Sequence, residues 1–117
     1  MLVGCASLHL SNDPDKFREE VKKHIVVGTP VAEAKNYLKS EGFRCVTNSF
    51  KRFDAEEFEG HTLDAARLGV LTNVTVLIFY KYRYVFPLER RNYTIGLLYD
   101  KDARISAVLA GISTTSL

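Results

Sequence analysis

One stretch limits the fold of this chain more than any other: residues 74–87, which read Val-Thr-Val-Leu-Ile-Phe-Tyr-Lys-Tyr-Arg-Tyr-Val-Phe-Pro. β-Branched and aromatic residues dominate it, and this composition predicts a long β-strand. Successive side chains of a strand point to opposite faces. One face would carry Val74, Val76, Ile78, Tyr80, Tyr82, Tyr84 and Phe86, and the other Thr75, Leu77, Phe79, Lys81, Arg83 and Val85.

The two faces of this strand differ in polarity. The face of Val76 and Tyr80 is apolar along its length, so we expect helices to cover it. The opposite face becomes charged at Lys81 and Arg83, where we expect it to be open to water. This asymmetry predicts an antiparallel sheet with helices on one side only.

Two helices are predicted ahead of this strand. Residues 13–15, Asp-Pro-Asp, are typical of a helix start, and we expect this helix to end near His24. Residues 28–30, Gly-Thr-Pro, then predict a break, with Thr29 as the N-cap of a second helix over 30–40.

The second helix should end in a Schellman motif. Gly42 takes the position after the helix, and Phe43 would contact Leu38. Beyond it, loose alternation predicts a strand over 43–50, and a strand pair over 93–99 and 104–110.

Residues 51–73 carry the weakest pattern. Their first half is acidic, and their second half, 62–69, predicts a short helix that ends at Gly69. A long connection of this kind inside a small domain is usually functional or mobile. The predicted class is α+β, with two N-terminal helices packed on one face of a four-stranded antiparallel sheet.

Length and charge limit the function classes. A chain of 117 residues predicts one domain, which we place at 13–112, preceded by a flexible tether within 1–12 and followed by a frayed end at 113–117. The net charge of +2 is too small to argue for nucleic acid by itself. No apolar run approaches the about 20 residues that a membrane helix needs.

The chain contains two cysteines, Cys5 and Cys45. Residues 2–5, Leu-Val-Gly-Cys, resemble the lipobox of bacterial lipoproteins, in which the cysteine is acylated. The basic and apolar parts of a signal peptide would lie upstream of Met1. The alternative is an ordinary apolar N-terminal segment. Cys45 is predicted to be a small buried hydrophobe.

Two longer stretches resemble a known family. Residues 25–43 are similar to the helix-turn-helix segment of the SmpA/OmlA (BamE-like) small outer-membrane lipoproteins, and residues 93–105 to their closing hairpin, with Ala103 where the turn usually has glycine. The resemblance implies the two-helix, four-stranded fold shared with β-lactamase-inhibitor proteins. It also implies an accessory, non-enzymatic protein on the periplasmic side of the outer membrane, anchored by a lipid on Cys5, that binds envelope proteins.

No motif for a cofactor or a metal stands out, and we expect none. His9, His24 and His61 lie far apart, whereas metal ligands usually come in local pairs. Neither a Gly-X-Ser-X-Gly motif nor a glycine-rich phosphate loop occurs.

Three ionisable residues leave an enzymatic alternative open. Glu56, Glu57 and His61 could do acid–base work in a hydrolase or an inhibitor-like domain that uses residues 51–73. A charge run of this kind is more often a solvated face.

The basic residues around the long strand form the candidate interaction surface. They are Lys81, Arg83, Arg90 and Arg91. An acidic protein partner or an anionic headgroup would suit such a surface. A cytoplasmic nucleic-acid-binding domain is the alternative, since aromatic and basic side chains together can hold a single strand. The tyrosines, however, are predicted to point away from Lys81 and Arg83, which weakens that alternative.

Overall fold

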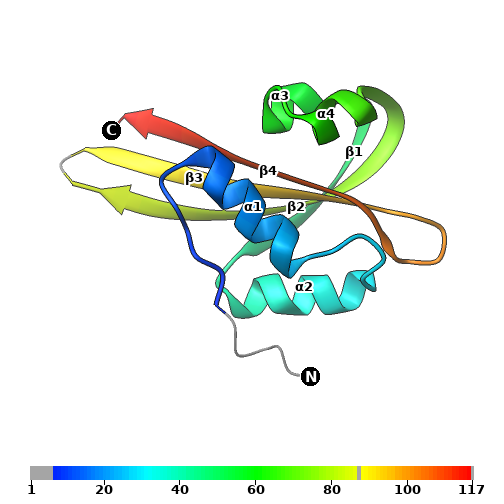
Figure 1. Ribbon diagram of the computed structural model, residues 1–117, viewed down its shortest axis with the longest axis horizontal. Helices are drawn as coiled ribbons and strands as arrows, with labels where there is room; N and C mark the ends of the chain where they lie inside the picture. Colours follow the sequence, from blue (N-terminus) through cyan, green and yellow to red (C-terminus); the bar gives the residue numbers. More distant parts are fainter. Residues whose placement is uncertain (1–6, 87, 117) are drawn as a thin grey trace.

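The protein folds as four helices and one four-stranded sheet, seen in a computed structural model that describes residues 7–86 and 88–116 (Figure 1). The strands pair antiparallel in the order β1-β2-β3-β4. The elements are α1 (Pro14–His24), α2 (Val31–Ser40), β1 (Arg44–Asp54), α3 (Ala55–Glu59), α4 (Leu63–Leu68), β2 (Val70–Val85), β3 (Glu89–Tyr99) and β4 (Ile105–Ser116). The predicted α+β class is confirmed, with α1 and α2 on one face of the sheet.

Local capping explains where α1 and α2 begin and end. The Asp13 side chain accepts a hydrogen bond from the backbone N–H of Asp15 at 2.9 Å, as predicted for an N-cap. The predicted Schellman ending of α2 is also confirmed, because the N–H of Phe43 donates to the carbonyl of Leu38 at 3.0 Å and Gly42 has a φ of 89°.

The start of α2 differs from the prediction. Pro30 occupies the N-cap position, and no side chain caps this end. Thr29 instead joins the sheet edge, since its carbonyl accepts a hydrogen bond from the N–H of Ile105 at 2.8 Å. A tertiary contact therefore outweighs the local capping preference of this residue.

The sheet face that α1 and α2 cover is the opposite of the one predicted. Phe17 and Leu38 pack in one buried cluster with Phe79 and Tyr93, and the rings of Phe17 and Tyr93 meet edge to face at 5.0 Å. Lys81 shares this face but is half-buried, because its ammonium group reaches a carbonyl at the end of α2. A charged residue therefore lies on the covered side, and its polarity misled the assignment of the faces.

Residues 51–73 fold as regular structure rather than as a mobile connection. β1 continues to Asp54, and two short helices, α3 and α4, lead into β2 at Val70. The predicted helix over 62–69 is confirmed and ends at Gly69.

The two short helices cover the second face of the sheet. Buried side chains from α3, α4 and all four strands form a cluster there, namely Phe53, Ala55, Ala65, Val76, Leu98 and Leu109. The expectation that helices lie on one side only is therefore wrong for this half of the sheet (Figure 1). The other half, toward the connection between β2 and β3, is covered by helices on one side.

The end of the sheet is longer than predicted. β3 starts at Glu89, and β4 continues to Ser116 opposite it, so residues 113–116 are paired rather than frayed. The amide of Asn92 donates to the hydroxyls of Ser113 and Thr115, which supports this extension.

The segment ahead of α1 also lies on the domain. Leu8 is buried in the cluster under α1 and α2, and its N–H donates to the Glu41 carboxylate at 2.6 Å. Residues 7–12 therefore do not form a free tether.

Gly111 should be essential for the docking of α3 on β4. A Cβ atom at this position would lie 2.7 Å from the backbone carbonyl oxygen of Phe58, so α3 would have to move. We expect Gly111→Ala to lower the free energy of unfolding by about 1–3 kcal/mol, as overpacking in a core usually does. Urea unfolding measures this, with the exposed Thr114→Ala on the same strand as the control. Equal stability of the two variants would contradict the observed packing.

Candidate functional site

The four predicted basic residues do not form one surface. Lys81, Arg83 and Arg91 lie on the face of the sheet that carries α1 and α2, whereas Arg90 lies on the opposite face, according to the alternation along β2 and β3. The ammonium group of Lys81 donates to the carbonyl of Glu41 at 2.7 Å, where it meets the negative end of the α2 dipole.

Arg83 and Arg91 hold the segment ahead of α1. The guanidinium of Arg83 donates to the carbonyl of Leu10 at 3.4 Å, and that of Arg91 donates to the side-chain oxygen of Asn12. Arg91 also lies 3.5 Å from the Glu89 carboxylate. Lys81, Arg83 and Arg91 therefore all make hydrogen bonds within the described residues.

Arg90 belongs instead to the tyrosine face. Its guanidinium lies 4.4 Å from the ring centroid of Tyr82, a cation–π contact, and the rings of Tyr80 and Tyr82 lie 5.7 Å apart. Arg44 is paired with Tyr80 across β1 and β2, so it shares this face. The predicted separation of the tyrosines from Lys81 and Arg83 is therefore confirmed, but Arg44 and Arg90 join the tyrosine face.

Large apolar side chains gather at the end of the β2–β3 hairpin. The exposed fractions are 47% for Tyr82, 69% for Tyr84, 94% for Phe86 and 65% for Leu88. We call these four residues together with Arg90 the hairpin-tip surface. The connection between β2 and β3 lies at the end of the sheet away from α3 and α4 (Figure 1), and no helix of the described residues covers this surface. Exposed apolar groups of this size are typical of interaction sites.

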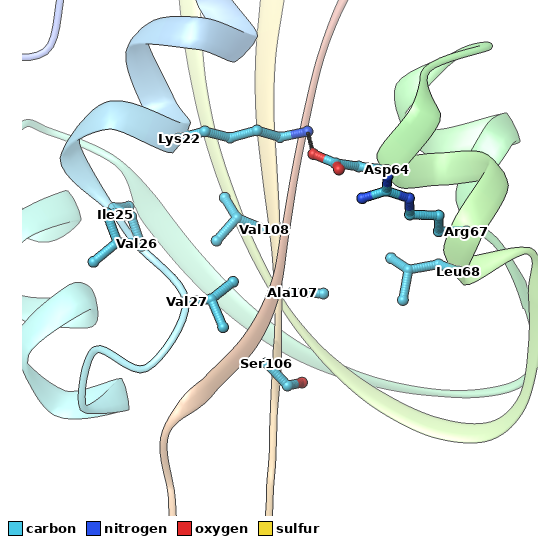
Figure 2. A pocket seen from close by; sticks show the side chains of 10 residues that line it. All are labelled: Lys22, Ile25, Val26, Val27, Asp64, Arg67, Leu68, Ser106, Ala107 and Val108. Atoms are coloured by element: carbon cyan, nitrogen blue, oxygen red, sulfur yellow. Dashed lines mark hydrogen bonds and ion pairs between the residues drawn. The ribbon is translucent and has the colours of Figure 1, made fainter.

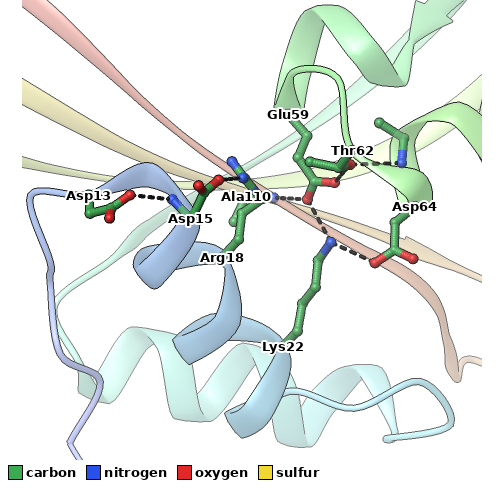
Figure 3. A network of polar contacts seen from close by, with 9 residues as sticks. Asp13, Asp15, Arg18, Lys22, Glu59, Thr62, Asp64 and Ala110 are labelled. Atoms are coloured by element: carbon green, nitrogen blue, oxygen red, sulfur yellow. Dashed lines mark hydrogen bonds and ion pairs between the residues drawn. The ribbon is translucent and has the colours of Figure 1, made fainter.

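A buried carboxylate connects the two helical layers at the edge of the sheet (Figure 3). The side chain of Glu59 is fully buried, and its Oε1 accepts a hydrogen bond from the N–H of Ala110 at 3.0 Å. The same oxygen lies 2.8 Å from the ammonium group of Lys22, and Oε2 accepts from the Thr62 hydroxyl. The ammonium group also donates to Asp64 at 2.7 Å, and this contact lowers the pKa of that carboxyl below its usual value.

The burial of Glu59 was not foreseen, because the acidic run around it is typical of a solvated face. Its partners come from α1, β4 and the loop before α4, which lie far apart in the sequence. Only the Thr62 contact is local.

The proposed acid–base residues lie in open solvent. The imidazole of His61 is 2.8 Å from the Glu56 carboxylate, yet its side chain is 93% exposed and that of Glu56 is 40% exposed. Glu57 is also exposed. A hydrolytic pair usually works in a site that excludes bulk water, and this geometry does not provide one. Across residues 7–86 and 88–116, no three histidine, cysteine, aspartate or glutamate side chains gather as a metal site would require.

The structure tests the prediction for Cys45 but not the prediction for Cys5. Cys45 is half-buried against the cluster under α1 and α2, so it is less enclosed than predicted. Cys5 lies outside the described residues, and its lipidation stays a prediction.

A groove runs along the outer edge of β4 (Figure 2). Its volume is about 370 Å³. The lining comes from the end of α1 and the loop after it, from α4, and from β4: Lys22, Ile25, Val26, Val27, Asp64, Arg67, Leu68, Ser106, Ala107 and Val108. No pattern along the sequence predicted it, since three separate segments meet there.

The contacts of Glu59 predict a large effect on stability. Glu59→Ala would leave the ammonium group of Lys22 with one carboxylate and the N–H of Ala110 without an acceptor. We expect a loss of about 3 kcal/mol in the free energy of unfolding, as for a broken buried ion pair. The matched control is Glu57→Ala on the same helix, which is exposed and should change stability by less than about 0.5 kcal/mol. Urea unfolding of both variants measures these changes. Similar losses of unfolding free energy in the two variants would contradict the structural role of Glu59.

Comparisons with protein-family models, with curated proteins and with solved structures found no significant match to this chain. None of the helices in the described part of the chain is long and apolar enough to span a bilayer. The resemblance to the SmpA/OmlA lipoproteins therefore stays a prediction.

Proposed function

We propose that this protein is a non-catalytic binding module of the bacterial envelope, which presents the hairpin-tip surface to a folded protein partner. The observation that supports this is the exposure of Tyr82, Tyr84, Phe86 and Leu88 together at one end of the sheet. Aromatic residues and arginine are enriched in the centres of protein interfaces and supply most of their binding energy.

The backbone under this surface favours tight binding. Tyr82 and Tyr84 sit in the paired part of β2, opposite Asn92 and Arg90 of β3. The ring of Tyr82 also supports the Arg90 guanidinium, whose Nε makes no hydrogen bond within the described residues. Side chains that are held before binding lose less entropy on association.

We further propose that a lipid on Cys5 anchors the protein on the periplasmic side of the outer membrane. The lipobox at 2–5 and the family resemblance support this proposal. The backbone N–H of Leu8 donates to the Glu41 carboxylate, and Leu8 follows Cys5 by three residues. A chain of three residues spans at most about 10 Å. An anchored domain would therefore lie close to the bilayer, with the end of α2 toward it.

The hairpin-tip surface can be tested in cells by site-specific photo-crosslinking. A photoreactive residue at position 84 should give a discrete adduct with a partner protein, and Tyr84→Ser with Phe86→Ser should abolish an adduct formed from position 82. The control is position 99, where Tyr99 is 40% exposed at the other end of β3. Both substitutions are at exposed sites, so the melting temperature should change little. The same adducts from positions 84 and 99, or none from either, would count against the proposal.

The anchor has its own test in the full-length precursor. Cys5→Ser should move the protein from the membrane fraction to the soluble fraction, because the acylated thiol is lost. Cys45→Ser is the matched control and should leave the distribution unchanged. Unaltered fractionation of the Cys5 variant would exclude lipid anchoring at this residue.

A second candidate function is binding of single-stranded nucleic acid. Arg44 and Arg90 share a sheet face with Tyr80 and Tyr82, and stacking aromatics beside arginines can hold bases and phosphates. Fluorescence titration with oligothymidylate separates the two functions. Binding that falls steeply with salt and requires Tyr82 would favour nucleic acid over a protein partner.

A further inference from the structure

The outer edge of β4 is closed at two points. At one end, the N–H of Ile105 donates to the carbonyl of Thr29, and the carbonyl of Ile105 accepts from the N–H of Gly28, both at 2.8 Å. Near the middle of the strand, which continues to Ser116, the N–H of Ala110 donates to Glu59. Since β4 is the last strand of the sheet, these contacts protect an edge that is otherwise open to pairing.

Between these two points the backbone of β4 has no outer partner within the described residues, and Val108, which is 7% exposed, lines the groove. Ala110 and Val108 are paired with Ile95 and Leu97 of β3 in one continuous register. In an antiparallel ladder, residues two apart direct their N–H and C=O groups to the same side. Because the N–H of Ala110 points away from β3, toward Glu59, the N–H and C=O of Val108 also point outward, and no group of the described residues pairs with them.

These unpaired groups of Val108 lie in the groove along β4. Figure 2 shows Val26 and Val27 on one side of this strand and Leu68 with Arg67 on the other. Val26 and Val27 are 55% and 65% exposed, which is high for valine in a folded domain. The groove therefore combines a free backbone donor and acceptor with apolar walls.

The charges at the groove favour an acidic ligand. The ammonium group of Lys22 bridges Glu59 and Asp64, so both carboxylates already have a cation. Arg67 is exposed and lines the groove, and its charge acts on the Asp64 carboxylate, but within the described residues it makes no ion pair at salt-bridge distance. A guanidinium in this position is suited to a carboxylate, which it can bind through two parallel hydrogen bonds.

We propose that this groove binds a short extended segment of a partner protein, which adds to β4 as a strand and carries a carboxylate for Arg67. Strand addition uses the main-chain groups for affinity and the flanking pockets for specificity. The opening between Ile105 and Ala110 admits only a few residues of an added strand. That length suits a peptide and is too short for edge-to-edge pairing of two copies of this chain. The site is separate from the hairpin-tip surface and does not depend on its function.

The probe is a phage library of random seven-residue peptides, selected on the full 117-residue chain. We expect the enriched peptides to alternate apolar residues with at least one aspartate or glutamate. Synthetic versions should shift the backbone amide signals of Val108 and Ala107 in ¹H–¹⁵N NMR spectra. Arg67→Ala should weaken binding about tenfold, the loss expected for one charge-assisted hydrogen bond. Arg52→Ala, at an arginine of β1 whose side chain is 61% exposed, is the matched control and should bind as the wild type does.

Four results would overturn the proposal. The first is a library that enriches no sequence, and the second is a set of peptides that shifts only the amides of the hairpin-tip surface. A peptide N-methylated at the residue opposite Val108 could bind as well as its parent, which would exclude strand addition. Shifts at Val108 that grow with protein concentration alone, together with a dimer in sedimentation, would assign the groove to a second copy of this chain.

Discussion

The buried carboxylate of Glu59 is the contact on which the assembly of this fold depends most. A charge removed from water must be matched by a cation and by hydrogen-bond donors. Lys22 of α1, the N–H of Ala110 in β4 and the Thr62 hydroxyl supply them. Helices as short as α3 and α4, with 5 and 6 residues, are not stable alone. Their position on β4 therefore depends on this contact and on the close approach of Phe58 to Gly111.

The same arrangement divides the sheet into two regions with different roles. Toward α3 and α4, apolar clusters fill both faces, and the edge of β4 is partly closed by Glu59 and by the loop after α1. Toward the β2–β3 connection, helices cover only one face, and large apolar side chains are exposed. The half of the sheet that is packed on both faces thus supports the end that helices cover on one face only. Such a division is suited to a module that binds other proteins, because the exposed side chains are held in place by the packed half.

Local patterns were reliable where the physical cause is itself local. Asp13 as an N-cap and Gly42 in the Schellman motif act within one turn of helix, so neighbouring residues are enough to predict them. Alternation correctly sorted the side chains of β2 into two sets. It could not say which set lies under α1 and α2, because both sets contain large apolar residues. The charge of Lys81 decided the prediction wrongly, since a long side chain can lie along a covered face and still place its ammonium group at a helix end.

The sequence by itself determined the α+β class, the position of α1 and α2, and the strand character of residues 74–85, because periodicity and capping are properties of adjacent residues. Only the tertiary structure decided that Glu59 is buried, that Arg90 packs on the ring of Tyr82, and that a groove follows β4. Each of these depends on residues from distant parts of the chain meeting at one place. The free energy of these contacts comes from desolvation and from ion pairs and hydrogen bonds between distant segments. A pattern of neighbouring residues does not reveal it.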